Sequence, residues 1–140
     1  MDLIPIGQAA DRLGLNPSTL RYYDERGLVS PPARQAGRRM YGPEQLRRLA
    51  FLKIAHHVGL SLDTAAAILD APDPQWRQTV REQIAELDRL IAQAQGAQKF
   101  LTHALSCPTN HPTRDCAAMI ATLDRLVEGT TVEQLAAEHT

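Results

Sequence analysis

The sequence is poor in aromatic residues and has no long apolar stretch, and each absence restricts what the protein can be. Aromatic side chains make up 4% of its 140 residues, so aliphatic side chains must build the core. No run approaches the roughly 18 apolar residues of a membrane-spanning helix, so we expect no membrane partner. The first residues lack the basic start and apolar stretch of a secretion signal. Two cysteines without such a signal predict a cytoplasmic protein with reduced thiols.

The sequence also lacks the residue patterns that mark common enzymes. It has no glycine-rich phosphate loop and no zinc-hydrolase motif. No set of nucleophile, base and orienting residue stands out either. We therefore expect a protein that is not an enzyme.

The charge is balanced overall but unevenly distributed along the chain. With 15 basic and 16 acidic residues, the net charge is -1. Residues 21–53 contain eight basic and three acidic residues, which gives this segment a charge of +5 and leaves -6 for the remainder. A basic segment attracts a polyanion such as nucleic acid, while the acidic remainder keeps the whole chain soluble.

Helix start and stop signals near the N-terminus predict a helix-turn-helix. An apolar pattern over residues 6–13 predicts a short helix that Gly14 ends. Asn16 as a side-chain cap, Pro17 in the first helical position and Gly27 beyond the last turn predict a second helix of about ten residues. Two short helices around such a turn are typical of DNA-binding proteins.

The segment after this motif predicts a wing followed by two more helices. Residues 29–41 are too broken by proline and glycine for a helix and favour a two-stranded loop. Pro43 restarts a helix that runs to about residue 58, and Ser61 caps another that runs through Leu69. The inward side of the first of these helices is expected to consist of Leu46, Leu49, Ile54 and Val58.

Beyond a proline-rich boundary at residues 70–74, the chain carries its longest periodic pattern. From Val80 to Leu105 apolar positions alternate in steps of four and three, with one polar member, Gln98. This seam spans about 38 Å at about 1.5 Å per residue. A second copy of the same helix is the simplest partner, and an intrachain hairpin with a C-terminal helix is the alternative.

The C-terminal signals predict a loop and two short helices. Cys107 and Pro108 end the long helix, and residues 107–116 form the loop. Asp115 is expected to cap the next helix, which Gly129 ends. Thr130 and Glu133 have the spacing of a capping box for a last short helix.

The helix after Asn16 has the composition of a surface that reads DNA. With Leu20 placed on the core side, Ser18, Arg21, Tyr22 and Glu25 point outward at 100° per residue. Their hydroxyl and guanidinium groups donate to phosphates and base edges. A solvated helix face is the alternative. Similarly, Arg38 and Arg39 in the wing are candidates for phosphate or minor-groove contacts, or else a charged loop tip.

These segments together resemble the MerR family of bacterial transcription regulators. The resemblance rests on the run from Thr19 to Val29, followed by two prolines, Arg34, the Gly37-Arg38-Arg39 turn and Tyr41. It continues in Leu46 and the Gly-Leu-Ser-Leu stretch at residues 59–62, and covers about half of the chain. It implies a mainly α-helical protein with a winged helix-turn-helix domain over 1–70. A long antiparallel coiled-coil dimerisation helix over 75–106 and a short effector region over 107–140 complete it.

The resemblance also implies a mode of action. Members bind a pseudo-palindrome in double-stranded promoter DNA as homodimers and distort the spacer when effector binds, so that RNA polymerase engages both promoter elements. In this chain the DNA contacts would come from the helix after Asn16 and from the wing. The expected contact residues are Ser18, Thr19, Arg21, Tyr22, Tyr23, Arg38, Arg39 and Tyr41.

The loop after the long helix is the candidate effector site. Cys107, His111 and Cys116 form a Cys-x3-His-x4-Cys pattern, and two thiolates with an imidazole suit zinc or another borderline-to-soft metal ion. Metal-sensing members of the family place thiols in this same loop. Members of the zinc and mercury branches usually add a cysteine from the partner's long helix, but residues 71–75 contain none.

Other interpretations of the effector region remain open. The two thiols suit sensing of oxidants or electrophiles through a disulfide. The cysteines also fit a purely structural role, in which Cys116 is a small buried apolar residue. A small-molecule ligand is a further alternative, although about 33 residues after Cys107 are few for a pocket. We interpret His56 and His57 as surface or interdomain packing residues rather than a ligand pair.

Overall fold

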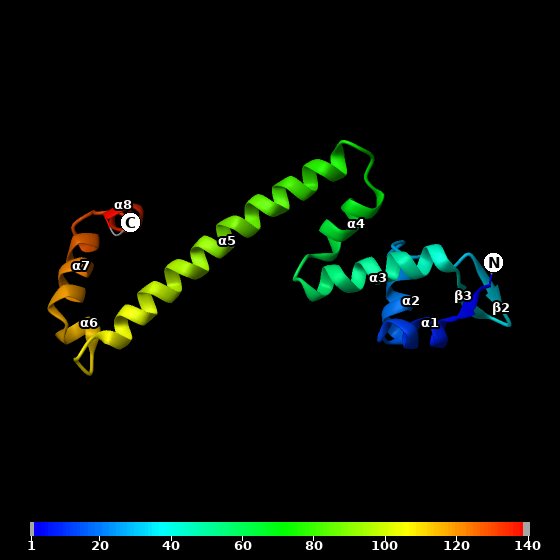
Figure 1. Cartoon of the computed structure of the whole chain (residues 1–140), viewed down its shortest axis with the longest axis horizontal. Helices are drawn as coiled ribbons and strands as arrows, with labels where there is room; N and C mark the ends of the chain where they lie inside the picture. The colour runs from blue at the N-terminus through cyan, green and yellow to red at the C-terminus, as the bar shows by residue number, and fades with distance from the viewer. Residues whose placement is uncertain (1, 139–140) are drawn as a thin grey trace. The chain divides into compact units, whose positions relative to one another are not determined.

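A computed structural model describes residues 2–138 of the chain (Figure 1). The chain divides into two units, of which one ends at Ala85 and the other begins at Glu86. The long helix α5 (Gln75–Ser106) contains this boundary. Over the described residues, no helix is both long and apolar enough to cross a membrane.

The N-terminal unit contains the predicted helix-turn-helix and wing. Helices α1 (Ile6–Leu13) and α2 (Pro17–Glu25) form the helix-turn-helix. Strands β2 (Ala33–Gln35) and β3 (Arg38–Tyr41) form the wing, and α3 (Pro43–His57) and α4 (Leu62–Asp70) follow. The predictions of these elements are confirmed to within about a residue at most ends.

Local chemistry accounts for most of these boundaries. Gly14 ends α1 in the left-handed region with a φ of 64°, where a side chain is strained. The Ser61 side chain caps α4, because its Oγ accepts a hydrogen bond from the Thr64 amide at 3.1 Å. The predicted side-chain cap at Asn16 is wrong, since Asn16 makes no such hydrogen bond. Pro17 alone marks the start of α2, where its missing N–H costs nothing.

One strand is missing from the sequence prediction. Strand β1 (Ile4–Pro5) pairs antiparallel with β3 and completes a sheet of order β1-β3-β2. Its two residues are too few to show the alternation by which a strand is recognised in sequence. The pairing of Ile4 with Tyr41 closes the wing onto the start of the domain.

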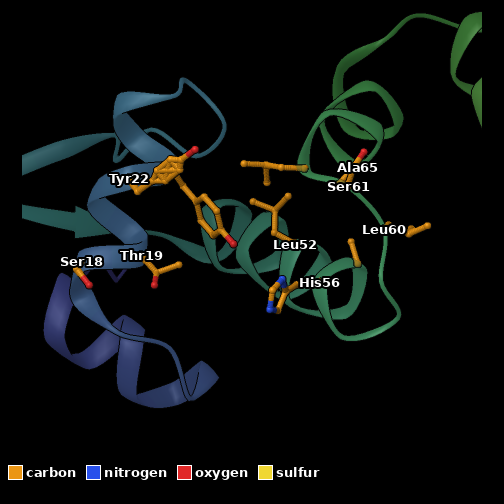
Figure 2. Close-up of a pocket in the computed structure, with 11 residues that line it drawn as sticks. Ser18, Thr19, Tyr22, Leu52, His56, Leu60, Ser61 and Ala65 are labelled. Carbon is orange, nitrogen blue, oxygen red and sulfur yellow. The ribbon is translucent and has the colours of Figure 1, made fainter.

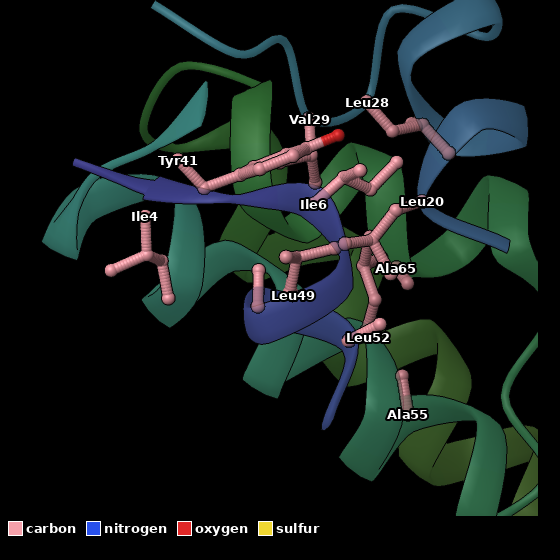
Figure 3. Close-up of a cluster of buried hydrophobic side chains, with 12 residues drawn as sticks. Ile4, Ile6, Leu20, Leu28, Val29, Tyr41, Leu49, Leu52, Ala55 and Ala65 are labelled. Atoms are coloured by element: carbon pink, nitrogen blue, oxygen red, sulfur yellow. The ribbon is translucent and has the colours of Figure 1, made fainter. Parts of the chain in front are cut away.

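Side chains from β1, α1, α2, β3, α3 and α4 form one mainly aliphatic core (Figure 3). Leu20, Leu49 and Leu52 are fully enclosed, and they connect α2 to α3. The prediction that Ile54 and Val58 point inward is wrong, because their exposures are 63% and 59%. The buried face of α3 follows Leu49, Leu52 and Ala55 in steps of three. Residues 54 and 58 therefore fall on the opposite side of the helix.

The C-terminal unit adds three short helices to the end of α5. They are α6 (Pro112–Asp115), α7 (Ala117–Val127) and α8 (Val132–Glu138). Met119 on α7 and Leu135 on α8 are buried. An ion pair joins Arg125 of α7 to Glu138 of α8 at 2.7 Å.

Three local predictions for this unit need correction. The expected loop over 107–116 contains the single turn of α6. The N-cap of α7 is Cys116 instead of Asp115, because Asp115 is the last residue of that turn. The capping box before α8 is one residue later than predicted: the Thr131 amide donates to the Gln134 side chain at 2.8 Å, and the Gln134 amide donates to the Thr131 hydroxyl at 3.1 Å.

The long helix α5 contains no buried residue. Its apolar seam is largely open to solvent, with exposures that rise from 38% at Leu87 to 88% at Leu105. Aliphatic residues at heptad spacing are stable in water only when another helix covers them. The exposed seam therefore agrees with the dimerisation helix that the sequence predicts.

Candidate nucleic-acid interface and effector loop

The outward face of α2 carries the side chains that the sequence predicts there. Leu20 is fully buried, whereas Ser18, Arg21 and Tyr22 are exposed. Thr19 and Tyr23 are half-buried at the sides of the helix. The helical geometry therefore presents one guanidinium and several hydroxyl groups on a single surface, which suits contacts to phosphates and base edges.

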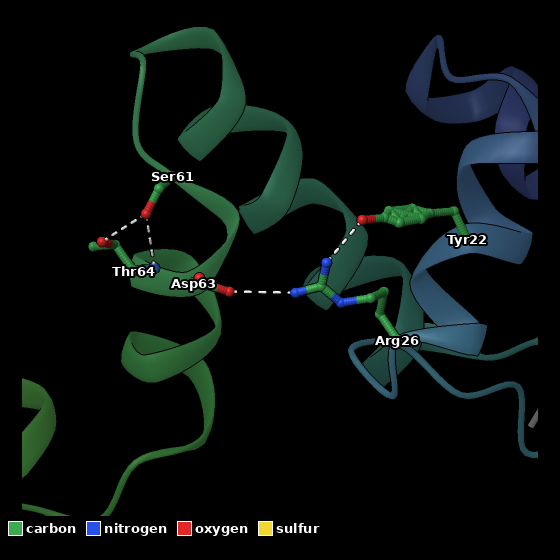
Figure 4. Close-up of polar contacts among 5 residues, drawn as sticks. All are labelled: Tyr22, Arg26, Ser61, Asp63 and Thr64. Atoms are coloured by element: carbon green, nitrogen blue, oxygen red, sulfur yellow. Dashed lines mark hydrogen bonds and ion pairs between the residues drawn. The ribbon is translucent and has the colours of Figure 1, made fainter.

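A charged network fixes the phenol of Tyr22 on this surface (Figure 4). One nitrogen of the Arg26 guanidinium donates to the Tyr22 hydroxyl oxygen at 2.8 Å, and another pairs with Asp63 of α4 at 3.2 Å. The same guanidinium lies over the Tyr22 ring, 5.6 Å from its centroid. Since the Tyr22 oxygen accepts this hydrogen bond, its own O–H remains available to an incoming acceptor. Arg26 is thus a positioning residue that the sequence analysis missed.

A cavity of about 370 Å³ lies beside this surface, between α2, α3 and α4 (Figure 2). The α2 side contributes Ser18, Thr19, Tyr22 and Tyr23. His56 at the end of α3 lies across the cavity from Thr19. Burial and the neighbouring Tyr22 raise the pKa of Tyr23, so its phenol stays protonated.

The two wing arginines have different surroundings. Arg38 is exposed, and its side chain forms no hydrogen bond or ion pair with the other described residues. Arg39 forms an ion pair with Asp24 of α2, in which its Nε donates to the carboxylate at 2.8 Å, and this hydrogen bond raises the pKa of Arg39. Both side chains are 20% exposed. Arg39 therefore fixes the wing to α2.

The structure corrects the assignment of Tyr41 as a DNA contact. Tyr41 is fully buried, and its hydroxyl has no hydrogen-bond partner among the described residues. Burial, followed by the field of Asp24, raises its pKa. Burial increases along β3, from the exposed Arg38 at its start to the buried Met40 and Tyr41 at its end.

A second arginine brace supports the chain just after α2. Arg48 donates to the Leu28 carbonyl from two guanidinium nitrogens at 3.0 and 2.8 Å, and it pairs with Asp70 at 2.9 Å. Its partners are 20 and 22 residues away in the sequence. No sequence signal identified this residue, because a basic residue on an exposed helix looks the same with or without such partners.

The effector loop brings the two cysteines together at the end of α5. Cys107 and Cys116 are free thiols, both half-buried. Hydrogen bonds from the Thr109 hydroxyl and the Thr109 backbone, and then one from the Cys116 thiol, lower the pKa of Cys107. The Cys107 sulfur lies 3.3 Å from the Thr109 hydroxyl oxygen. A thiol with a lowered pKa is a better metal ligand and nucleophile than an ordinary one.

His111 does not join this pair in the structure. It is exposed at the start of α6. Across residues 2–138, no group of three or more His, Cys, Asp or Glu side chains is close enough to hold a metal ion together. Among the described residues, the loop therefore brings Cys107 and Cys116 together without His111.

Fold and surface together define a DNA-binding regulator. The profile described as the MerR HTH family regulatory protein matches residues 4–72, and the one described as MerR, DNA binding matches residues 46–104. The chain belongs to the MerR family of transcription regulators. The regulators of this family are dimers, in agreement with the exposed seam of α5.

Similar proteins include regulators from several bacteria. The HTH-type transcriptional regulator CueR of Salmonella typhi is 32% identical over 119 residues, which cover 79% of this chain and 86% of CueR. The mercuric resistance operon regulatory protein of Bacillus cereus is 30% identical over 120 residues, covering 79% and 90%.

Solved structures of similar proteins have the same fold. The N-terminal part of MtaN, the multidrug transporter activator of Bacillus subtilis, matches with a TM-score of 0.64 and 25% identity, over 74% of this chain and 99% of the solved N-terminal chain. PbrR691 of Ralstonia metallidurans CH34, in complex with lead(II), matches with a TM-score of 0.63 and 20% identity, over 85% and 98%.

Proposed function

We propose that this regulator responds to a soft metal ion held by Cys107 and Cys116 at the end of α5. The observation that carries the proposal is the pair of half-buried free thiols, in which Cys116 is among the groups that lower the pKa of Cys107. Thiolate is the form that binds metal, so a lowered pKa reduces the proton competition at neutral pH.

The donor set favours soft ions of low coordination number over zinc. Structural zinc takes four ligands, and the chain supplies two thiols with no third His, Cys, Asp or Glu gathered beside them among the described residues. Two thiolates suffice for thiophilic ions that accept two ligands, such as the monovalent ions of the copper group or Hg(II). When bound, such an ion links the end of α5 to the start of α7 through its two sulfur ligands.

The similar proteins support a metal effector without specifying the ion. One relative is a mercuric resistance regulator, and one structural neighbour was solved with lead(II). The mercuric ion and lead(II) are both ions that bind well to sulfur ligands, in agreement with the thiol pair of this chain.

We further propose that α2 enters the major groove of promoter DNA while the wing contacts the backbone. Ser18, Thr19, Arg21, Tyr22 and Tyr23 supply the groove and phosphate contacts, and Arg38 supplies the wing contact. Residues 1–70 then form the DNA-binding domain, 75–106 the dimerisation helix and 107–140 the effector region. RNA polymerase is the partner at the promoter, and metal binding alters the bend that the dimer imposes on the DNA.

The metal proposal is tested by binding to the purified, reduced protein. Ag(I), Hg(II) and Zn(II) are added in turn, and the ultraviolet absorbance of the metal–thiolate bond is followed in competition with a chelator of known affinity. We expect one soft ion per subunit and no such binding in Cys107→Ser or Cys116→Ser. His111→Ala is the matched control and should bind normally.

Two results would contradict the metal proposal. One is tight binding of a soft ion that survives loss of either cysteine. The other is transcription in vitro that ignores all three ions but responds to hydrogen peroxide through a Cys107–Cys116 disulfide, which would establish the thiol-sensing alternative.

The DNA proposal is tested by footprinting on a promoter fragment. Arg21→Ala should abolish protection, because the variant loses an exposed guanidinium on the outward face of α2. Full sequence-specific protection by that variant would refute the assignment of α2 as the recognition helix.

A further inference from the structure

The cavity between α2, α3 and α4 has the chemistry of an anion site. Its lining includes the hydroxyls of Ser18, Thr19, Tyr22 and Tyr23, together with the imidazole of His56. Of the described residues that line it, none carries a carboxylate. Hydroxyl and cationic donors of this kind are the groups that bind nucleic-acid phosphates.

The hydroxyl donors of the cavity are not equally available. The Ser61 hydroxyl donates to the Thr64 side chain at 2.9 Å, so its proton is engaged. The Tyr22 oxygen, in contrast, accepts from Arg26 at 2.8 Å, which leaves the Tyr22 proton free to donate. Tyr23 also remains protonated because burial raises its pKa. The α2 side of the cavity is therefore a preformed set of donors.

His56 is the one lining residue that can supply a positive charge. Several other charged groups on neighbouring elements have partners of their own, and Arg21 and Glu25 of α2 are exposed and do not line the cavity. Arg26 of α2 pairs with Asp63 of α4 at 3.2 Å. On α3, the Lys53 ammonium donates to the Leu13 carbonyl, and His57 does not line the cavity. Apart from His56, the residues that line the cavity have hydroxyl or apolar side chains, so none of them duplicates the charge of the imidazolium.

We propose that a backbone phosphate of the bound duplex occupies this cavity and that His56 binds it as imidazolium, so DNA binding by this regulator takes up protons. The proposal rests on the proposed role of α2 as the recognition helix, since the cavity opens beside its donor face. Histidine is the side chain whose charge changes between about pH 5 and pH 8. A phosphate beside His56 favours the charged form, and the affinity for DNA therefore rises as the pH falls through this range.

The test compares DNA affinity at pH 6 and pH 8 for the full-length protein. A duplex is first selected from a random-sequence library by repeated rounds of binding, and its Kd is then measured by fluorescence anisotropy at constant ionic strength. If each subunit takes up one proton on binding, its contribution to the DNA affinity changes by at most about tenfold per pH unit. For the wild type we expect about three- to tenfold tighter binding at pH 6 than at pH 8.

Three variants isolate His56, which is exposed and whose replacement leaves the core intact. His56→Gln should bind with a pH-independent affinity, and at pH 6 it should lose about 0.9 per subunit from the slope of log K against log salt. His56→Arg should bind at pH 8 as tightly as the wild type does at pH 6, because arginine keeps its charge. His57→Gln is the matched control and should retain the pH dependence of the wild type.

The outcomes separate this proposal from the DNA-binding assignment. If no duplex is selected, or if Arg21→Ala binds the selected duplex as the wild type does, the assignment of α2 fails and the proposal fails with it. If the duplex is bound with the same pH dependence by the wild type and by His56→Gln, the role of His56 alone is refuted. Loss of the pH dependence in His57→Gln would likewise refute it.

Discussion

Replacing Tyr41 by phenylalanine should stabilise the protein, although most core substitutions destabilise. The Tyr41 side chain is fully buried, and its hydroxyl has no hydrogen-bond partner among residues 2–138. An unpaired buried polar group costs about 1–3 kcal/mol of desolvation. Tyr41→Phe removes that cost and keeps the ring that fills the core. We expect the free energy of unfolding to rise by about 1 kcal/mol, after allowance for the small space left by the oxygen.

Urea unfolding followed by circular dichroism measures this effect at one fixed protein concentration, since the stability of a dimer depends on concentration. A gain of about 1 kcal/mol raises the Tm by about 3 °C for a chain of this length. Tyr23→Phe is the control, because its half-buried phenol lies at the cavity and its loss should change stability by less than about 0.5 kcal/mol.

The same variant tests whether Tyr41 contacts DNA. Tyr41→Phe should bind a selected duplex with unchanged affinity, because the hydroxyl is not exposed. Destabilisation by more than about 0.5 kcal/mol would show that the hydroxyl has a partner, and the reasoning from burial would be refuted. A loss of DNA affinity without a loss of stability would restore Tyr41 as a contact residue.

Three further predictions concern the wing, the effector loop and α5. Ala36 has a φ of 50° in the wing turn beside Gly37, a conformation that Asn tolerates better than Ala. Ala36→Asn should therefore raise the free energy of unfolding by about 0.5–1 kcal/mol. An unchanged urea midpoint would contradict this expectation. Thr109→Val should raise the pKa of Cys107, because the thiolate loses the hydrogen bond from the Thr109 hydroxyl. The pH midpoint of iodoacetamide alkylation, measured in a Cys116→Ala background, should therefore move upward. An unchanged midpoint would show that Thr109 has no effect. Ile91→Glu places a charge in the exposed apolar seam and should yield monomers in sedimentation experiments, whereas a stable dimer would show that the seam is not the interface.

Most of the fold could be predicted because its signals are local. Gly14, Pro17 and Ser61 mark helix ends through their own backbone preferences or side-chain caps, and the structure places the ends there. The heptad pattern of α5 was equally plain, because its period is a property of the sequence alone. Predictions that depended on the exact turn of a helix were less reliable, as at Ile54 and in the capping box before α8.

The candidate site was only partly predictable, for a physical reason. The outward face of α2 follows from helical geometry once Leu20 is placed in the core, and the structure agrees. Which residues pair with each other across the fold cannot be predicted from any periodicity of the sequence. The Arg39–Asp24 pair joins residues 15 positions apart, and the Arg26–Asp63 pair joins residues 37 positions apart.

The sequence by itself determined most of the helix boundaries, the wing, the dimerisation seam and the two cysteines of the effector loop, since each depends on residues that are neighbours or at a regular spacing. Only the tertiary structure decided which of these residues meet. It buried Tyr41, left His111 apart from the thiol pair and placed His56 across a cavity from the donors of α2. Such contacts depend on how separate elements pack, and a polar side chain has the same identity in the sequence whether packing exposes it, buries it or pairs it.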